Sequence, residues 1–201
     1  MDGCSRGSRR VMIEAAVGAA TIRCWFDDLP PVDCRHGDLL RREVMGGPRS
    51  PVGPRRAALA VSQPAGPRGR LYGMLGGNIE PASRPQVSIE VVTCREPGER
   101  IGWAPEARHD DIRGGLVHYG HWALHGVVLG VEAHGLGSAA ICLDTAAEAH
   151  VGSAPIVFEW LGASIVVLLS ADAPPRRPTD LLAMLGADTS LSLAQYGDRT
   201  R

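Results

Sequence analysis

The sequence of 201 residues contains no lysine, because all 21 of its basic residues are arginines. A high-GC genome is the simplest explanation of this bias, but the bias has a chemical consequence in any case. No lysine is available as a general base, as a Schiff-base former or as the cation of a phosphate-binding loop. Any proton transfer in this chain must therefore use another side chain.

Strong net charge is also lacking, since the formal charge is −1. No overall field favours nucleic acid or an anionic membrane as a partner. The longest apolar run is interrupted by Glu132 and several histidines, so no membrane span is expected. The five cysteines form no C-x-x-C pair and follow no recognisable secretory signal. We therefore expect reduced thiols in a cytoplasmic protein.

The length suits one domain of moderate size. We expect a loose leader at residues 1–9, a single domain at residues 10–185 and a weakly patterned tail at residues 186–201. Apolar periodicity and turn residues predict the elements of the domain. Helices are predicted over residues 11–20, 36–45, 110–134, 145–150 and 180–185. Strands are predicted over residues 57–62, 71–75, 87–93, 138–143, 156–160 and 163–170.

The most distinctive segment is GHWALHGVVLGVEAHGLGSAAICLD, residues 120–144. Its apolar residues cover one broad face of a helix, which is therefore expected to be central and mostly buried, with Gly135 as its stop. His121 and His125 lie four residues apart and could ligate a metal. The alternatives are a helix or subunit interface and a position beside a bound ligand. Because no further ligand pattern accompanies the two histidines, no metal site is predicted.

Four segments occur in an order that is typical of one enzyme family. AATIRCWFDDLPPV resembles an opening Arg-Ser-x-Arg-x-Phe…Pro-Val signature, and GGPRSPVGPRRAALAVS resembles a Pro-Ser-x-Gly loop before a strand. The segment of residues 120–144 resembles a Gly-His pair, a long helix, Gly-Leu-Gly, a strand and an acidic residue. IVVLLSADAPPRRP resembles a closing strand with a Pro-rich arginine segment. Together they resemble the flavin-dependent nitroreductase superfamily, and within it the SagB-type azoline dehydrogenases.

This resemblance implies an α+β fold with a central, mostly antiparallel sheet flanked by helices and a long central helix. It also implies FMN at the interface of a homodimer, or of a heterodimer with a related subunit. Arg23 is the expected phosphate ligand, and the backbone at Gly135, Leu136 and Gly137 would lie beside the flavin ring. Further cofactor contacts are expected from Thr21, Arg49, Ser50 and Arg177. The chain departs from the family at Ala20, where the first arginine would stand, and in lacking a Gln-Asn pair.

The family oxidises azoline rings to azoles in peptide natural-product biosynthesis, which implies a small-molecule or modified-peptide substrate. A lysine–tyrosine pair is implicated in its proton abstraction, and this chain has no lysine. His121, Tyr119 and His109 are therefore the catalytic candidates, and His118 could also serve as a base.

Three interpretations stay open. The first is an FMN-dependent oxidoreductase. The second is a catalytically degenerate subunit that supports an active partner in a heteromeric complex. The third is a structural or ligand-binding protein without flavin, with which the aromatic content of 4% is consistent.

Overall fold

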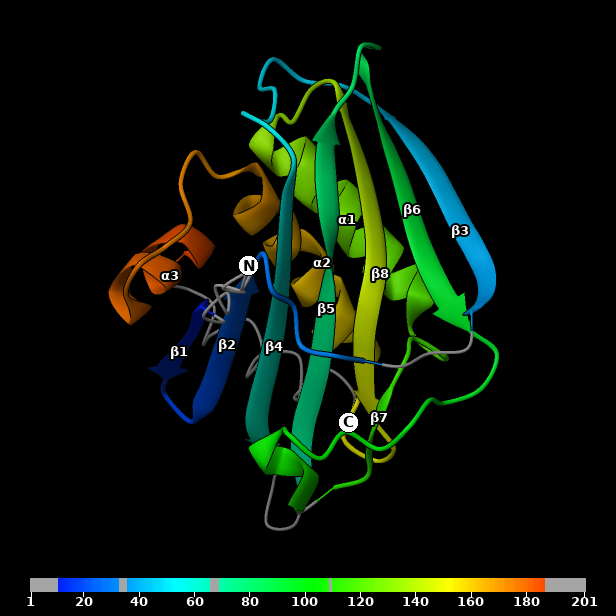
Figure 1. Cartoon of the computed structure of the whole chain (residues 1–201), viewed down its shortest axis with the longest axis vertical. Coiled ribbons are helices and arrows are strands. Elements are labelled where there is room, and N and C mark those ends of the chain that lie inside the picture. The colour runs from blue at the N-terminus through cyan, green and yellow to red at the C-terminus, as the bar shows by residue number, and fades with distance from the viewer. Residues whose placement is uncertain (1–10, 33–35, 66–68, 109, 187–201) are drawn as a thin grey trace, which may run out of the picture.

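The structure is a computed structural model that describes residues 11–32, 36–65, 69–108 and 110–186. In these ranges the chain is α+β, with a mostly antiparallel open sheet of eight strands and three α-helices (Figure 1). The strands are β1 (Val11–Val17), β2 (Ala20–Phe26), β3 (His36–Met45), β4 (Arg55–Ala65), β5 (Gly69–Pro81), β6 (Gln86–Cys94), β7 (Ile112–Gly114) and β8 (Ala139–Ala149). The helices are α1 (Gly120–His134), α2 (Pro155–Ser170) and α3 (Pro178–Leu185), with a short 3₁₀ helix, η1 (Pro105–Arg108). The expected fold class is confirmed at this level.

The strand order is β1-β2-β4-β5-β8-β6-β3, and β7 pairs with the end of β8. All pairs are antiparallel except β6 with β8. β8 therefore lies in the middle of the sheet although it is the last strand in the sequence. β1 and β3 form the two outer edges (Figure 1).

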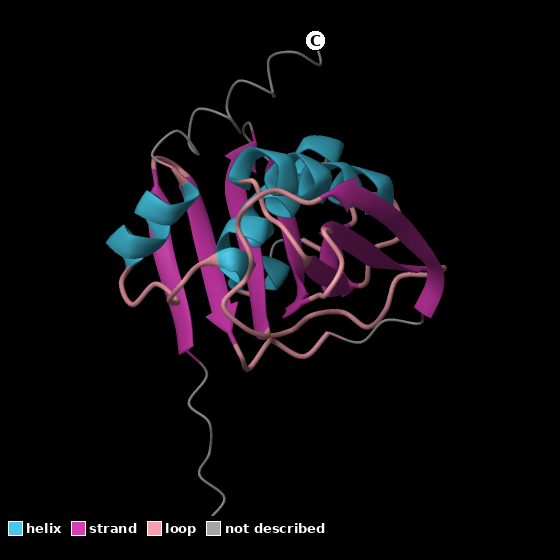
Figure 2. Cartoon of the chain, turned by 90° about the horizontal axis from the view of Figure 1, so that it is seen from above, coloured by secondary structure: helices cyan, strands magenta, loops and turns pink. Residues whose placement is uncertain are grey.

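Helices α1 and α2 pack together on one face of the sheet (Figure 2). The apolar side chains between them and the strands, such as Val127, Val131 and Phe158, are fully buried. The helices approach closely because glycines lie at their contact. A Cβ atom at Gly126 would collide with the carbonyl oxygen of Glu159, and one at Gly162 would collide with that of Ala123.

The opposite face of the sheet is partly covered by the connection from β6 to β7. A second apolar cluster lies beneath this connection and includes Trp25, Tyr72 and Ile101. The ring of Trp103 meets Trp25 edge-on, with centroids 5.7 Å apart. This connection brings distant parts of the sequence to the end of β8, where the candidate site lies.

Several expected elements are confirmed. The strands predicted over residues 57–62, 71–75, 87–93 and 138–143 lie in β4, β5, β6 and β8, and the last predicted helix corresponds to α3. The central helix also forms, and Gly135 ends it in the left-handed conformation, with φ of 58°. It begins at Gly120, however, so the start predicted at residue 110 was wrong.

Other expected elements were wrong. Residues 11–20 and 36–45, predicted as helices, form β1, the start of β2, and β3. Residues 145–150 were predicted as a helix, but residues 145–149 form the end of β8 and His150 follows in a turn. Residues 156–160 and 163–170, predicted as strands, form the single helix α2. Short apolar runs are compatible with either state, because pairing and burial in the folded chain decide between them.

The remaining expectations concern the cysteines, membrane spans and the two ends of the sequence. Cys94 is disulfide-bonded, so the expectation of only reduced thiols was wrong for this residue. No helix in the described ranges is long and apolar enough to cross a membrane. The predicted leader at residues 1–9 and the predicted tail beyond Gly186 lie outside the described residues.

Candidate functional site

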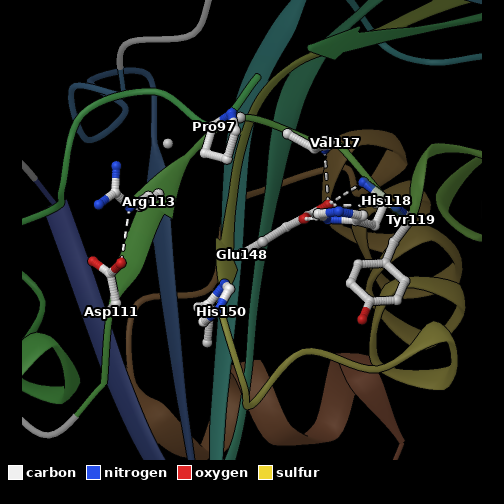
Figure 3. A pocket seen from close by; sticks show the side chains of 11 residues that line it. Pro97, Asp111, Arg113, Val117, His118, Tyr119, Glu148 and His150 are labelled. Carbon is white, nitrogen blue, oxygen red and sulfur yellow. Dashed lines mark hydrogen bonds and ion pairs between the residues drawn. The ribbon is translucent and has the colours of Figure 1, made fainter. Parts of the chain in front are cut away.

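A cavity of about 200 Å³ lies where the end of β8 meets β7 and the segment before α1. In Figure 3, His118, Tyr119 and Glu148 lie on one side of it and Asp111 and Arg113 on the other. The lining residues are Pro97, Asp111, Arg113, Gly114, Gly115, Val117, His118, Tyr119, Glu148, Ala149 and His150. They come from separate parts of the sequence, so no single motif marks the cavity.

Glu148 is the buried charged group of this cavity, with only 8% of the residue exposed. Its Oε1 accepts hydrogen bonds from the backbone N–H groups of Val117, at 2.9 Å, and His118, at 3.1 Å. Its Oε2 lies 3.0 Å from Nδ1 of the His118 ring. These donors replace the water that a buried carboxylate would otherwise need. Glu148 thereby fixes both the backbone that leads into α1 and the ring of His118.

The side chain of His118 is 68% exposed on the solvent side of Glu148. A carboxylate accepts hydrogen bonds but has no proton to donate, so the hydrogen bond requires the proton to be on Nδ1. In the neutral ring, Nε2 then carries a free lone pair. The two residues form a dyad, called here the His118–Glu148 dyad, in which Nε2 can accept a proton.

Tyr119 also lines the cavity, but its hydroxyl is already engaged. The hydroxyl donates a hydrogen bond to the carbonyl oxygen of Ser153 at 2.9 Å, and the ring stacks on Phe158 with centroids 5.0 Å apart. Burial raises the pKa of Tyr119, and the charge of Glu148 raises it further. The phenol therefore stays protonated and anchors the start of α1. This geometry favours a structural role over the catalytic role expected from the sequence.

Two charged side chains, Asp111 and Arg113, line the side of the cavity opposite His118 (Figure 3). Nε of Arg113 donates to Oδ2 of Asp111 at 2.9 Å, and both side chains are partly exposed. Asp111 also lies 3.7 Å from Nε of Arg100. No contact engages the terminal nitrogens of Arg113 within the described residues. The Arg113 guanidinium can therefore bind an anion on this side of the cavity.

Another catalytic candidate, His121, does not reach this cavity. His121 is exposed on α1 and does not line it, and His109 lies outside the described residues. His125, the proposed metal-ligating neighbour of His121, instead has its Nδ1 2.8 Å from Oε2 of Glu159 on α2. Within the described ranges, no group of three or more potential ligands is placed to hold a metal ion.

Arg23, the expected phosphate ligand, is buried in an ion-pair cluster. Its NH1 donates to both carboxylate oxygens of Glu106, at 2.7 and 2.8 Å, and its Nε donates to Glu14 at 2.6 Å. Burial alone would lower the pKa of Arg23, but the hydrogen bonds and charges of these two carboxylates raise it overall. Two carboxylates around one guanidinium leave little capacity for a phosphate at the same position. Arg23 therefore ties η1 to the sheet.

The expected flavin contacts after α1 are likewise satisfied within the chain. The N–H groups of Gly135 and Leu136 donate to the carbonyl oxygens of Glu132 and Val131, and that of Gly137 donates to Arg49. The loop with Arg49 thus lies beside Gly135–Gly137, and the two segments bind each other. Ser50, the next residue of that loop, is exposed.

The remaining cofactor candidates are dispersed. Thr21 lies on β2 opposite Ser62, and Arg177 pairs with Asp180 at the start of α3, with a distance of 2.9 Å. The cavity at His118 is also smaller than the roughly 300–1,000 Å³ of pockets for drug-sized ligands. The cavity is thus too small for the phosphate and three-ring flavin of FMN, and none of the expected cofactor residues lines it.

Little in the sequence indicates the central role of Glu148. It is an isolated acidic residue in the apolar run of residues 146–151, AAEAHV, which is a weak sign of a buried carboxylate. Its partners lie about 30 residues earlier, in the segment before α1. The pairing of β7 with β8 and the hydrogen bond from the N–H of Gly115 to the carbonyl oxygen of Ala146 bring these parts together.

Comparisons of the chain with protein-family models, with curated proteins and with solved structures found no match.

Proposed function

We propose that the chain is an enzyme in which His118 acts as a general base, oriented by Glu148, on a small anionic substrate. The observation that carries this proposal is the hydrogen bond between Nδ1 of His118 and the buried carboxylate of Glu148. A carboxylate in this position fixes the tautomer of the ring and stabilises the imidazolium that forms when Nε2 takes a proton.

The dimensions and charges of the cavity limit the substrate. A volume of about 200 Å³ admits a molecule of a few heavy atoms or one end of a larger molecule. Arg113, on the side opposite His118, favours a carboxylate or phosphate group, because its terminal nitrogens can form two parallel hydrogen bonds to such a group. Together they favour a small anion whose reacting atom approaches His118.

The lining residues also limit the reaction. Among the described residues that line the cavity there is no serine, threonine, cysteine or lysine. The described lining therefore offers no serine, threonine, cysteine or lysine nucleophile for a covalent intermediate. His118 would instead activate a water molecule or remove a proton from the substrate, with Glu148 holding the ring in place.

A substrate panel with matched variants tests this proposal. The panel consists of p-nitrophenyl esters and phosphates of small anionic groups, and kcat/KM is measured for each. We expect His118→Gln to lower kcat/KM by roughly 10²–10⁴-fold, the usual contribution of a general base. His125→Gln is the control, because His125 also pairs with a glutamate but lines no described cavity. Equal activity of His118→Gln and the wild type would refute the role of His118.

The resemblance to flavin enzymes leads to a second candidate function. The engagement of Arg23 by two carboxylates favours the degenerate subunit over the active oxidoreductase. A visible spectrum of the purified protein, before and after addition of FMN, tests this choice. A colourless protein that binds no FMN supports a non-catalytic subunit, whereas a yellow protein that releases FMN on heating supports the oxidoreductase.

A further inference from the structure

β3 is an outer strand of the sheet, and in the described structure it pairs only with β6 (Figure 1). Its ten residues are HGDLLRREVM. The free edge of such a strand presents a row of unpaired N–H and C=O groups, which can pair with another strand. The side chains of β3 indicate which strand fits.

The exposed side chains of β3 are partly apolar. Leu39 is 40% exposed and Met45 is 78% exposed. Both share a sheet face with Arg41 and Glu43, because alternate residues of a strand point to the same side. Leu40 and Val44 lie on the other face and pack partly against the helices.

β3 is complementary to itself. In an antiparallel pair of two β3 strands with Arg42 opposite its own copy, Arg41 lies opposite Glu43 of the partner subunit. In the same register Leu39 lies opposite the partner's Met45, and Leu40 opposite the partner's Val44. Opposite charges and apolar pairs directly across a sheet are stabilising. A two-fold axis perpendicular to the sheet generates this register and keeps the helices of both copies on one side.

We propose that β3 pairs with β3 of a second copy in this register, so that the two sheets become continuous. The contact of Arg41 with Glu90 supports this pairing. Arg41 donates to Glu90 through Nε, at 2.9 Å, and not through its terminal nitrogens. No contact engages the terminal nitrogens of Arg41 in the part of the chain that the structure describes. They can therefore bind Glu43 of the partner subunit, which gives a row of alternating charges, Glu90–Arg41–Glu43, across the interface.

One pair in this register is unfavourable. Arg42 lies opposite the partner's Arg42, and like charges directly opposite each other are destabilising. The competing interpretation is that the charges of β3 keep this edge unpaired, as charges on edge strands often do. The two interpretations predict opposite results for charge substitutions.

Sedimentation equilibrium of the full chain over a range of concentrations tests the proposal. We expect the wild type to dimerise. Glu43→Arg should weaken dimerisation roughly tenfold or more, because both Arg41–Glu43 pairs across the interface become pairs of arginines. Arg42→Thr should strengthen dimerisation, since it removes the like-charged pair. Glu132→Arg on the exposed side of α1 is the control for the charge change and should leave the dimer unaffected. A wild type that stays monomeric, or an Arg42→Thr variant that dimerises less, would overturn the proposal.

Cysteine cross-linking tests the register itself. Directly opposite residues have Cα atoms about 4.5–5.5 Å apart, within the range of disulfides. Under mild oxidation Arg42→Cys should therefore form a covalent dimer, beyond any formed by the wild type. Glu43→Cys should not, because the two introduced cysteines would be about 8 Å apart, beyond the limit of about 7 Å for a disulfide. Cross-linking of Glu43→Cys but not of Arg42→Cys would contradict this register.

Discussion

Arg23 shows how far a single residue can be interpreted from the sequence. An arginine in this segment was expected to bind a phosphate, and the structure does surround it with oxygens. Those oxygens belong to Glu14 and Glu106, and Glu106 follows 83 residues later in the chain. The sequence indicates a cation that needs a partner but not which anion the fold supplies. Burial of the pair makes it a structural contact with a measurable effect on stability.

Removal of the Arg23 guanidinium should therefore destabilise the fold. Arg23→Met leaves the carboxylate of Glu106, which is 4% exposed, without its main partner. We expect the free energy of unfolding in urea to fall by roughly 3–5 kcal/mol, the usual effect of breaking a buried ion pair. Arg56→Met is the control, because its pair with Asp144 is largely exposed and should contribute less than about 1 kcal/mol. Equal effects of the two substitutions would contradict a structural role for Arg23.

His134, the last residue of α1, should make stability depend on pH. Burial lowers its pKa, and the nearby charge of Arg49 lowers it further. The unfolded chain then binds the proton more tightly than the folded chain does, so protonation opposes folding. The contribution of His134 should be constant above its unfolded pKa of about 6.5 and become less favourable as the pH falls below it. Below the lowered folded pKa the contribution should be constant again.

Urea titrations between pH 8 and pH 5 measure this effect, with His134→Gln as the comparison. The difference in unfolding free energy between the wild type and this variant should shift in favour of the variant as the pH falls. An unchanged difference across this range would show that His134 titrates alike in both states.

At the scale of elements, the least predictable segments are those whose secondary structure depends on contacts with the rest of the fold. The apolar run PIVFEWLGASIVVLLS is rich in residues that favour strands, yet it forms α2, which packs against β4, β5 and α1. Residues 11–26 form a hairpin whose turn contains Gly18 with φ of 57°. Alanines had suggested a helix there, but pairing of β2 with β4 stabilises the extended state.

The contact between α1 and α2 depends on glycines. Replacing one of them by alanine should therefore lower the free energy of unfolding, although this change normally stabilises a helix. Alanine is normally the better helix residue by about 1 kcal/mol. In Gly126→Ala, however, the new methyl group would collide with the backbone of Glu159. We therefore expect the free energy of unfolding to fall by roughly 1–3 kcal/mol, as is usual for overpacking. Thermal and urea unfolding measure it. Gly53→Ala, where the added methyl meets open space, should be near neutral, and a stabilised Gly126→Ala would refute the close helix contact.

At the scale of the whole molecule, local periodicity and backbone conformation predicted the central helix and its glycine stop, whereas the α+β class was implied by the resemblance. It did not predict the cavity, because the dyad joins β8 to the segment before α1. His118 was recognised as a possible base from its chemistry alone. Glu148 was missed because nothing near it in the sequence indicates a partner. The self-complementary edge became recognisable only when residues 36–45 proved to be a strand.

The state of the His118 ring tests the central proposal most directly. Two-bond ¹H–¹⁵N correlation spectra distinguish the imidazole tautomers, and comparison with His118→Gln assigns the signal. At about pH 8.5, where imidazoles are normally neutral, we expect the proton on Nδ1 and an unprotonated Nε2. In Glu148→Gln, which no longer presents a carboxylate to the ring, this preference should weaken. A wild-type ring that carries its proton on Nε2 would show that Glu148 does not orient His118 as a base.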